Sequence, residues 1–220
     1  MSSSIDPIIG MLKASNAVWA ERVSQDKPNF FHETTKGQTP KILWIGCADS
    51  RVPESVILGA APGDIFVHRN IANQVRLDDA SALSVLQYGV ENVGVEHVII
   101  SGHTHCGGAL ACVQGVRGRL PVDPKSTLAG FLSPIVELAD GLGLSDENIP
   151  TDKALMSLVE ENVRVQVKNV ITTETMQNIW KMGKNVVVHG WVYHLGSGRV
   201  VDLGVSYGLN EYKQSAPQKE

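Results

Sequence analysis

The sequence predicts an α/β protein of one domain, in which a central, mostly parallel β-sheet is flanked by helices. Short apolar runs at residues 41–46, 64–68 and 97–101 are typical of strands that are buried on both faces. A helical pattern separates the second run from the third, and strands that alternate with helices indicate parallel βαβ units. The chain has 220 residues, 43% of them hydrophobic, so it can bury one sizeable core.

The segment before the first strand predicts an amphipathic helix. Residues 5–23 carry apolar side chains at helical spacing, and Asp6-Pro7 supplies an N-cap followed by a proline in the first turn. We expect this helix to form an arm that packs on another surface. The predicted organisation is therefore an N-terminal helical arm at 1–35, an α/β domain at 36–213 and a flexible polar tail at 214–220.

The remaining elements follow from periodicity and turn residues. Asp78-Asp79 favours a helix cap, and glycines at Gly196-Ser-Gly198 favour the turn of a hairpin. The elements predicted after the second strand are helices at 80–93, 107–116, 128–142 and 151–182, a loop at 115–126, a strand at 185–189 and a hairpin at 193–201.

Composition narrows the classes of function. With 19 Lys and Arg against 23 Asp and Glu, the net charge of −4 argues against nucleic acid or an anionic membrane as partner. No apolar run approaches the roughly 18 residues of a membrane span, and the start resembles neither a secretory signal nor a transit peptide, so we expect a cytoplasmic protein. Three scattered cysteines do not make a disulfide framework, and reduced thiols are available for metal binding or catalysis.

Two cysteines and a histidine follow the first and third predicted strands. Cys47 follows the first strand segment, and His103 and Cys106 follow the third. Ligands bind at the carboxyl ends of strands in an open parallel sheet. A Cys2His set leaves one position of a tetrahedral zinc ion open, which is the arrangement of a catalytic site. His105 could replace His103, but we favour His103 because adjacent side chains diverge on an extended backbone.

A carboxylate and a guanidinium follow Cys47 at once. Taken alone, Asp49 and Arg51 would be interpreted as a surface ion pair. Beside a metal, however, Arg51 could hold the carboxylate ionised and orient it to accept a proton or a hydrogen bond from metal-bound water. The same carboxylate could instead bind the zinc, which would give an inhibited form of the site.

The other cysteine and the other histidines have no ligand spacing. Cys112 lies inside a predicted helix and is interpreted as a buried core thiol. A cysteine nucleophile paired with His103 is a further possibility, but it leaves Cys106 without a role. The histidines interpreted as structural or surface residues are His32, His68, His97, His189 and His194.

Three segments together resemble the signature blocks of β-class carbonic anhydrases. They are Cys47-Ala-Asp-Ser-Arg-Val-Pro, Val67-His-Arg-Asn-Ile-Ala-Asn-Gln74 and Gly102-His-Thr-His-Cys-Gly-Gly108, and the similarity extends from about residue 36 to residue 206. The resemblance implies reversible hydration of CO2 to bicarbonate and a proton by attack of zinc-bound hydroxide, which is the activity of a lyase. The residues to which it gives roles are Cys47, His103 and Cys106 as ligands of one Zn²⁺ per chain, and Asp49 and Arg51 as a catalytic dyad.

The resemblance also implies sites for substrate and for a regulator. Lys36-Gly-Gln-Thr-Pro40 is similar to the plant-type segment whose glutamine binds substrate, and two aromatic residues match the same pocket, which assigns Gln38, Phe66 and Tyr88 to CO2 and bicarbonate. Some bacterial members hold an inhibitory bicarbonate with a Trp, an Arg and a Tyr. The matching residues here are Trp44, Arg69 and Tyr193, although the two aromatic ones lie on predicted strands, where an aromatic side chain more often serves packing.

Family members are dimers or larger oligomers in which the N-terminal helix crosses onto the partner, so the resemblance implies a homodimer or homotetramer with the arm packed on a partner subunit. Two other functions stay open. A related zinc site could hydrolyse carbonyl sulfide or carbon disulfide, and sequence does not separate this from CO2 hydration. A non-catalytic bicarbonate sensor is disfavoured, because a sensor does not need the proton-handling pair Asp49 and Arg51.

Overall fold

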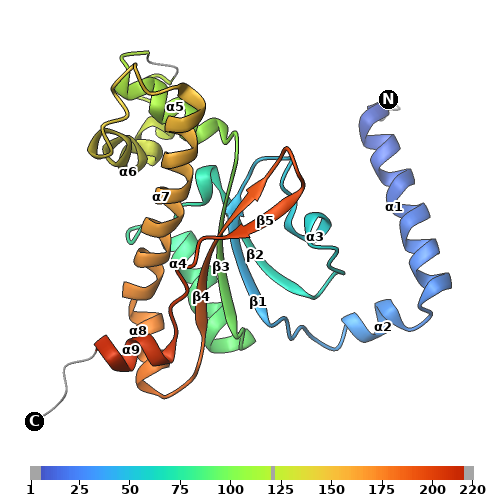
Figure 1. Cartoon of the computed structure of the whole chain (residues 1–220). Helices are drawn as coiled ribbons and strands as arrows, with labels where there is room; N and C mark the ends of the chain where they lie inside the picture. The colour runs from blue at the N-terminus through green and yellow to red at the C-terminus, as the bar shows by residue number, and fades with distance from the viewer. Residues whose placement is uncertain (1–5, 120–121, 216–220) are drawn as a thin grey trace, which may run out of the picture. The chain divides into compact units, whose positions relative to one another are not determined.

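The computed structural model describes residues 6–119 and 122–215. The chain divides into two compact units, Met1–Gln38 and Thr39–Glu220. The helices and strands follow one another as α1 (Pro7–Asp26), α2 (Phe30–Thr34), β1 (Ile42–Cys47), α3 (Glu54–Ile57), β2 (Ile65–Asn70), the 3-10 turn η1 (Ile71–Asn73), α4 (Ala80–Gln87), the π-helical turn η2 (Tyr88–Val93), β3 (His97–His103), α5 (Gly107–Val116), α6 (Thr127–Gly141), α7 (Thr151–Thr172), α8 (Glu174–Lys181), β4 (Val187–His194), β5 (Arg199–Asp202) and α9 (Leu209–Ser215) (Figure 1). No helix in these described stretches is long and apolar enough to cross a membrane.

The first unit consists of the predicted helical arm and one short helix. Helix α1 begins as expected, because the Asp6 carboxylate accepts a hydrogen bond from the Ile8 N–H at 2.8 Å and proline occupies the first turn. Trp19 of α1 and Phe31 of α2 meet edge to face, with ring centroids 5.7 Å apart. No side chain of α1 is buried, and several large apolar ones are exposed.

The second unit contains the predicted sheet. Its strand order is β2-β1-β3-β4-β5; the first four strands are parallel, and β5 pairs antiparallel with β4 through the predicted hairpin. Parallel pairing places the carboxyl ends of β1 and β3 at the same edge, since Gly46 of β1 is in register with Ser101 of β3. The residues that follow these two strands are therefore brought together, as the sequence predicted.

The hydrophobic core lies between one face of the sheet and the helices, and α7 runs along this face (Figure 1). Strand residues such as Leu43, Ile45, Val98 and Ile100 are fully buried there. Glycines in β3 and β4 allow α7 to approach closely. A Cβ atom at Gly102 would lie 2.8 Å from Val163 Cγ2, so α7 packs directly against the end of β3.

Three predictions about helices need correction. The helix expected at 151–182 is two helices, because the Thr173 hydroxyl donates to the Val170 carbonyl at 2.7 Å and accepts from the Met176 N–H at 3.4 Å, which ends α7 and begins α8. The helix expected at 80–93 becomes π-helical from Tyr88. Helix α9 reaches Ser215, so the expected tail at 214–220 begins as helix, and residues 216–220 lie outside the described part. Helices α2, α3 and α9 were not predicted, because they are too short to show a periodicity.

Candidate metal centre

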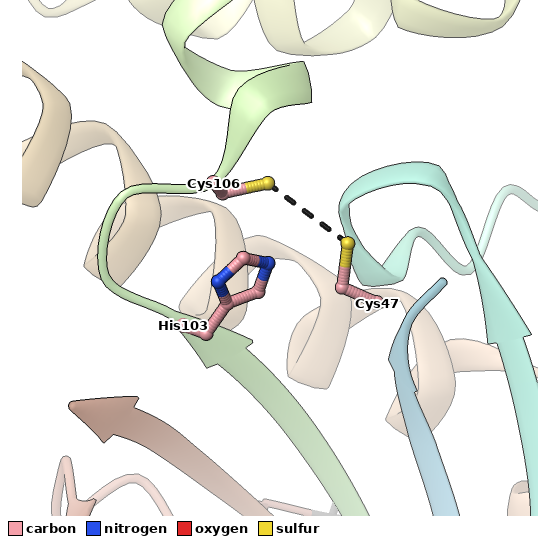
Figure 2. A group of neighbouring side chains, drawn as sticks. All are labelled: Cys47, His103 and Cys106. Carbon is pink, nitrogen blue, oxygen red and sulfur yellow. Dashed lines mark hydrogen bonds between the residues drawn. The ribbon is translucent and has the colours of Figure 1, made fainter. Parts of the chain in front are cut away.

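The three candidate ligands come from two neighbouring strands and the start of a helix. Cys47 ends β1, His103 ends β3, and Cys106 precedes the first residue of α5. Figure 2 shows the three side chains converging, and one potential ligand atom from each lies within 4.8 Å of the others. All three residues are buried. The structure therefore assembles the predicted Cys2His set with His103 in it, whereas His105 is exposed.

The hydrogen bonds of His103 leave one ring nitrogen ready to bind a metal. Its Nδ1 lies 3.0 Å from the Thr104 carbonyl oxygen, which only accepts, so Nδ1 carries the proton. Its Nε2 is buried and has no hydrogen-bond partner in the described structure. A buried polar atom without a partner is costly unless a ligand binds it. Metal-bound histidines commonly have this arrangement, in which the second nitrogen donates to a carbonyl.

The two cysteine sulfurs form a close, buried pair. The Sγ atoms of Cys47 and Cys106 are 4.0 Å apart. The Cys47 pKa is lowered, chiefly by the hydrogen bond from the Cys106 thiol. The Cys106 pKa is raised, because its thiol holds the proton of the pair and is buried. A bound divalent cation would displace that proton and leave two thiolates.

These donors fit zinc. Two thiolates at the usual Zn–S length of about 2.3 Å lie about 3.8 Å apart in a tetrahedral site, close to the observed sulfur separation of 4.0 Å. Thiolate and imidazole are ligands that zinc prefers, and three protein ligands leave a fourth position for a reacting molecule. Cys47, His103 and Cys106 would hold the ion.

Asp49 lies beside the cluster and is held by Arg51. Its two carboxylate oxygens accept hydrogen bonds from Arg51 Nε at 3.0 Å and Arg51 Nη2 at 2.7 Å, and Oδ2 is 3.8 Å from His103 Nε2. This guanidinium is the main reason why the Asp49 pKa is held well below its usual range. Arg51 also donates to the His105 carbonyl at 3.1 Å, which ties the pair to the loop between His103 and Cys106.

Arg69 has a role that the sequence did not reveal. Its Nε donates to the Cys47 carbonyl at 2.8 Å and its Nη2 to the Asp49 carbonyl at 2.6 Å, so it fixes the backbone that carries a ligand and the carboxylate. Sequence patterns do not predict such hydrogen bonds, because every residue carries a backbone carbonyl. Trp44 is buried on β1, and no hydrogen bond, ion pair or ring contact in the described chain joins Trp44, Arg69 and Tyr193. Regulatory bicarbonate binding by these three residues stays a prediction.

The predicted aromatic residues meet each other but lie away from the metal ligands of the same chain. The rings of Phe66 and Tyr88 have centroids 6.0 Å apart. Phe66 is in register with Leu43, four residues before Cys47. At about 3.3 Å per residue, this places the aromatic pair about 13 Å along the sheet from the cysteine. Gln38 is the last residue of the first unit.

The remaining cysteine and histidines do not join the cluster. Cys112 is buried in the core on α5, as predicted, and burial raises the pKa of its thiol to about 12. His97 Nδ1 lies 3.0 Å from His189 Nε2, and His189 Nδ1 lies 2.9 Å from the Ser206 hydroxyl. The His68 ring contacts the Asn70 amide at 3.2 Å. These histidines have the structural surroundings that were expected.

Comparison with known proteins agrees with this geometry. The family model described as carbonic anhydrase matches residues 42–200. A carbonic anhydrase of Emericella nidulans is 35% identical over 198 residues, which cover 88% of this chain and 82% of that protein. The chain therefore belongs to the carbonic anhydrase family, and the solved structures that it resembles place it in the β class.

Two of these structures are from filamentous fungi. The β-carbonic anhydrase CafA of Aspergillus fumigatus is 35% identical, with a TM-score of 0.81 and coverage of 95% of this chain and 96% of that one. A structure from Sordaria macrospora, described among two tetrameric β-carbonic anhydrases, is 33% identical, with a TM-score of 0.78 and coverage of 92% and 100%. The similarity extends over nearly the whole length of each chain.

Proposed function

We propose that this protein is a carbonic anhydrase, a lyase that catalyses the zinc-dependent, reversible hydration of CO2 to bicarbonate and a proton. One observation carries the proposal. The buried Nε2 of His103, which has no partner in the described structure, converges with two cysteine sulfurs, and Asp49 lies beside this open set of donors. Membership of the carbonic anhydrase family supports the same reaction.

Each residue near the cluster has a distinct task. When bound, zinc lowers the pKa of a coordinated water and thereby supplies a nucleophile for CO2. The Asp49 carboxylate, whose Oδ2 is 3.8 Å from His103 Nε2, would accept a proton or hydrogen bond from the reacting molecule, while Arg51 keeps it ionised and oriented. Because Cys47 and Cys106 offset the charge of the ion, we expect activity to rise on the alkaline side of neutrality.

The substrate pocket is best explained by a second copy of the chain. Phe66 and Tyr88 are too far along the sheet from Cys47 to line the reacting position of their own chain. We therefore assign CO2 and bicarbonate binding to Phe66, Tyr88 and Gln38 of a neighbouring subunit. The exposed apolar side chains of α1 support an oligomer in which the arm packs on its partner, and the Sordaria relatives are tetrameric.

The test is stopped-flow CO2 hydration from pH 6 to 9 on protein whose zinc content is measured in the same sample. We expect one zinc per chain and activity that climbs with pH. The variant Cys47→Ser should lose zinc and activity together, whereas Cys112→Ser, which changes a buried cysteine outside the cluster, should keep both.

Two results would contradict the proposal. If the zinc-loaded protein did not hydrate CO2 at any pH, the result would favour hydrolysis of carbonyl sulfide or bicarbonate sensing as the function. Protein without zinc would overturn the assignment of Cys47, His103 and Cys106.

A further inference from the structure

Helix α7 carries a stripe of three amide side chains next to its apolar stripe. Asn162, Gln166 and Asn169 follow each other at intervals of four and three residues and so lie on one face of the helix. Asn162 and Gln166 are each only 3% exposed. Polar groups so deeply buried must be hydrogen-bonded, and their partners show what this stripe does.

All three amides bind the same short segment, the loop at residues 71–75 that follows β2. Asn162 Nδ2 donates to the Ala72 carbonyl at 3.0 Å, and Asn169 Nδ2 donates to the Val75 carbonyl at 2.9 Å. The Val75 N–H donates to Gln166 Oε1 at 2.8 Å. The amides are also linked to one another, because Gln166 Nε2 donates to Asn162 Oδ1 at 2.9 Å. We call these three residues the amide clamp.

The loop needs such support because its backbone is strained. Ala72 and Asn73 have φ values of 58° and 48°, in the left-handed region that residues other than glycine rarely occupy. Strained backbone persists only where the surrounding structure holds it in place. The amide clamp supplies that constraint from a helix about 90 residues further along the chain, since the Asn162–Ala72 contact spans 90 positions.

The same loop adjoins a metal ligand. Asn70, just before the loop, is in register with Cys47, and its carbonyl accepts from the Ala48 N–H at 2.8 Å. Helix α7 also packs on β3 through Val163, which would touch a Cβ at Gly102 just before His103. One helix thus contacts β3, which carries His103, and the loop that adjoins Cys47.

We propose that Asn162, Gln166 and Asn169 are positioning residues of the metal site, which hold the Cys47 segment at the correct distance from His103 and Cys106. This inference rests on the proposed zinc site. The amides touch neither the metal ligands nor the reacting atoms, and they act through the loop and the helix. Groups hydrogen-bonded directly to metal ligands typically change metal affinity by about 10- to 100-fold when they are removed, and for amides that act one contact further away we expect the lower end of this range.

The test compares Gln166→Met with Gln177→Met in the full-length protein. Gln177 is a matched control, because its half-buried amide donates to the Ile171 carbonyl at 2.7 Å but lies on α8, outside the clamp. Zinc affinity is measured by competition with a chelator, and the cobalt-substituted proteins are compared by the intensity of the thiolate-to-cobalt absorption. We expect Gln166→Met to weaken zinc binding about tenfold or more and to alter the cobalt spectrum, with wild-type values for Gln177→Met.

A milder variant keeps the inference testable if Gln166→Met does not fold. Asn169→Ala removes the bond to the Val75 carbonyl from a half-buried position, and it should weaken zinc binding several-fold. Wild-type affinity and spectrum in a folded clamp variant would overturn the inference, as would equal losses in Gln177→Met. Absence of zinc from the wild-type protein would instead overturn the proposed function, so the two failures are distinguishable.

Discussion

At the scale of single residues, the site depends on which atoms have hydrogen-bond partners. The Thr104 carbonyl fixes the proton of His103 on Nδ1, which leaves a lone pair on Nε2 close to the two sulfurs. Arg51 plays the equivalent part for Asp49, because its bidentate grip holds the carboxylate in one orientation beside the cluster. Metal binding and proton handling are thus assigned to different side chains, which mutation can separate.

Replacing the carboxylate tests this separation. We expect Asp49→Ala to retain one zinc per chain while kcat for CO2 hydration falls about 100-fold or more, because a positioned proton acceptor is lost. The matched control is Asp78→Ala, since Asp78 is also bound by an arginine two residues away, with both contacts at 2.9 Å, but is exposed and far along the chain from the cluster. Turnover at the parental rate in Asp49→Ala would refute the dyad.

At the scale of elements, two strand ends and one helix start create the site, and α7 holds them together. Sequence predicted the strands well, because buried parallel strands are continuous apolar runs between turn residues. The sequence analysis missed the break between α7 and α8 at Thr173. The hydroxyl of Thr173 bonds both helix ends, but the periodicity of apolar residues does not distinguish it from a threonine inside a helix. Sequence also did not show that α7 packs closely on β3, because this contact joins segments about 60 residues apart.

The packing of α7 on β3 gives a prediction for Gly102. The variant Gly102→Ala would place a Cβ 2.8 Å from Val163 Cγ2 and 3.2 Å from Val159 Cγ1. We expect this overpacking to lower the free energy of unfolding by about 1–3 kcal/mol in denaturant titrations. As a control, Gly130→Ala on α6 meets no atom within 4 Å and should be neutral or stabilising. Equal free energies of unfolding for the two variants would contradict the prediction and show that α7 shifts to accommodate the added methyl group at little cost.

At the scale of the whole molecule, we expect one chain to need a bound metal and a second chain for full stability and activity. The described chain buries a ligand set around an unpartnered nitrogen, and it leaves the apolar side chains of α1 exposed. Both features predict that stability and activity depend on species that bind the folded chain.

Removal of zinc should destabilise the fold. A ligand present at about 1,000 times its Kd adds about 4 kcal/mol, which corresponds to a decrease in Tm of about 10 °C on chelation for a chain of this size. Thermal scans of holoprotein, chelated protein and chelated protein with zinc restored would measure the change. An unaltered Tm after verified loss of zinc would contradict a buried metal site.

The arm gives a prediction about assembly. Met11 and Val18 lie two turns apart on one face of α1 and are 61% and 67% exposed. We expect Met11→Glu combined with Val18→Glu to shift the oligomer toward monomer and to reduce CO2 hydration, because Phe66 and Tyr88 of the partner would be withdrawn. Light scattering after size-exclusion chromatography measures the mass, with Asn16→Glu as a control of added charge on another face of α1. An unchanged mass would refute packing of this face on a partner.

The sequence by itself determined the strands, the cap of α1 and the Cys47, His103 and Cys106 set, because each depends on local periodicity or on short spacings at strand ends. Only the tertiary structure decided the free nitrogen of His103, the grip of Arg69 on two carbonyls, the amide clamp and the distance of Phe66 from Cys47. The free nitrogen of His103 follows from the carbonyl of its neighbour Thr104, whereas the other features depend on how segments far apart in the chain pack together. Their positions therefore follow from packing, and no pattern of side chains along the sequence records them.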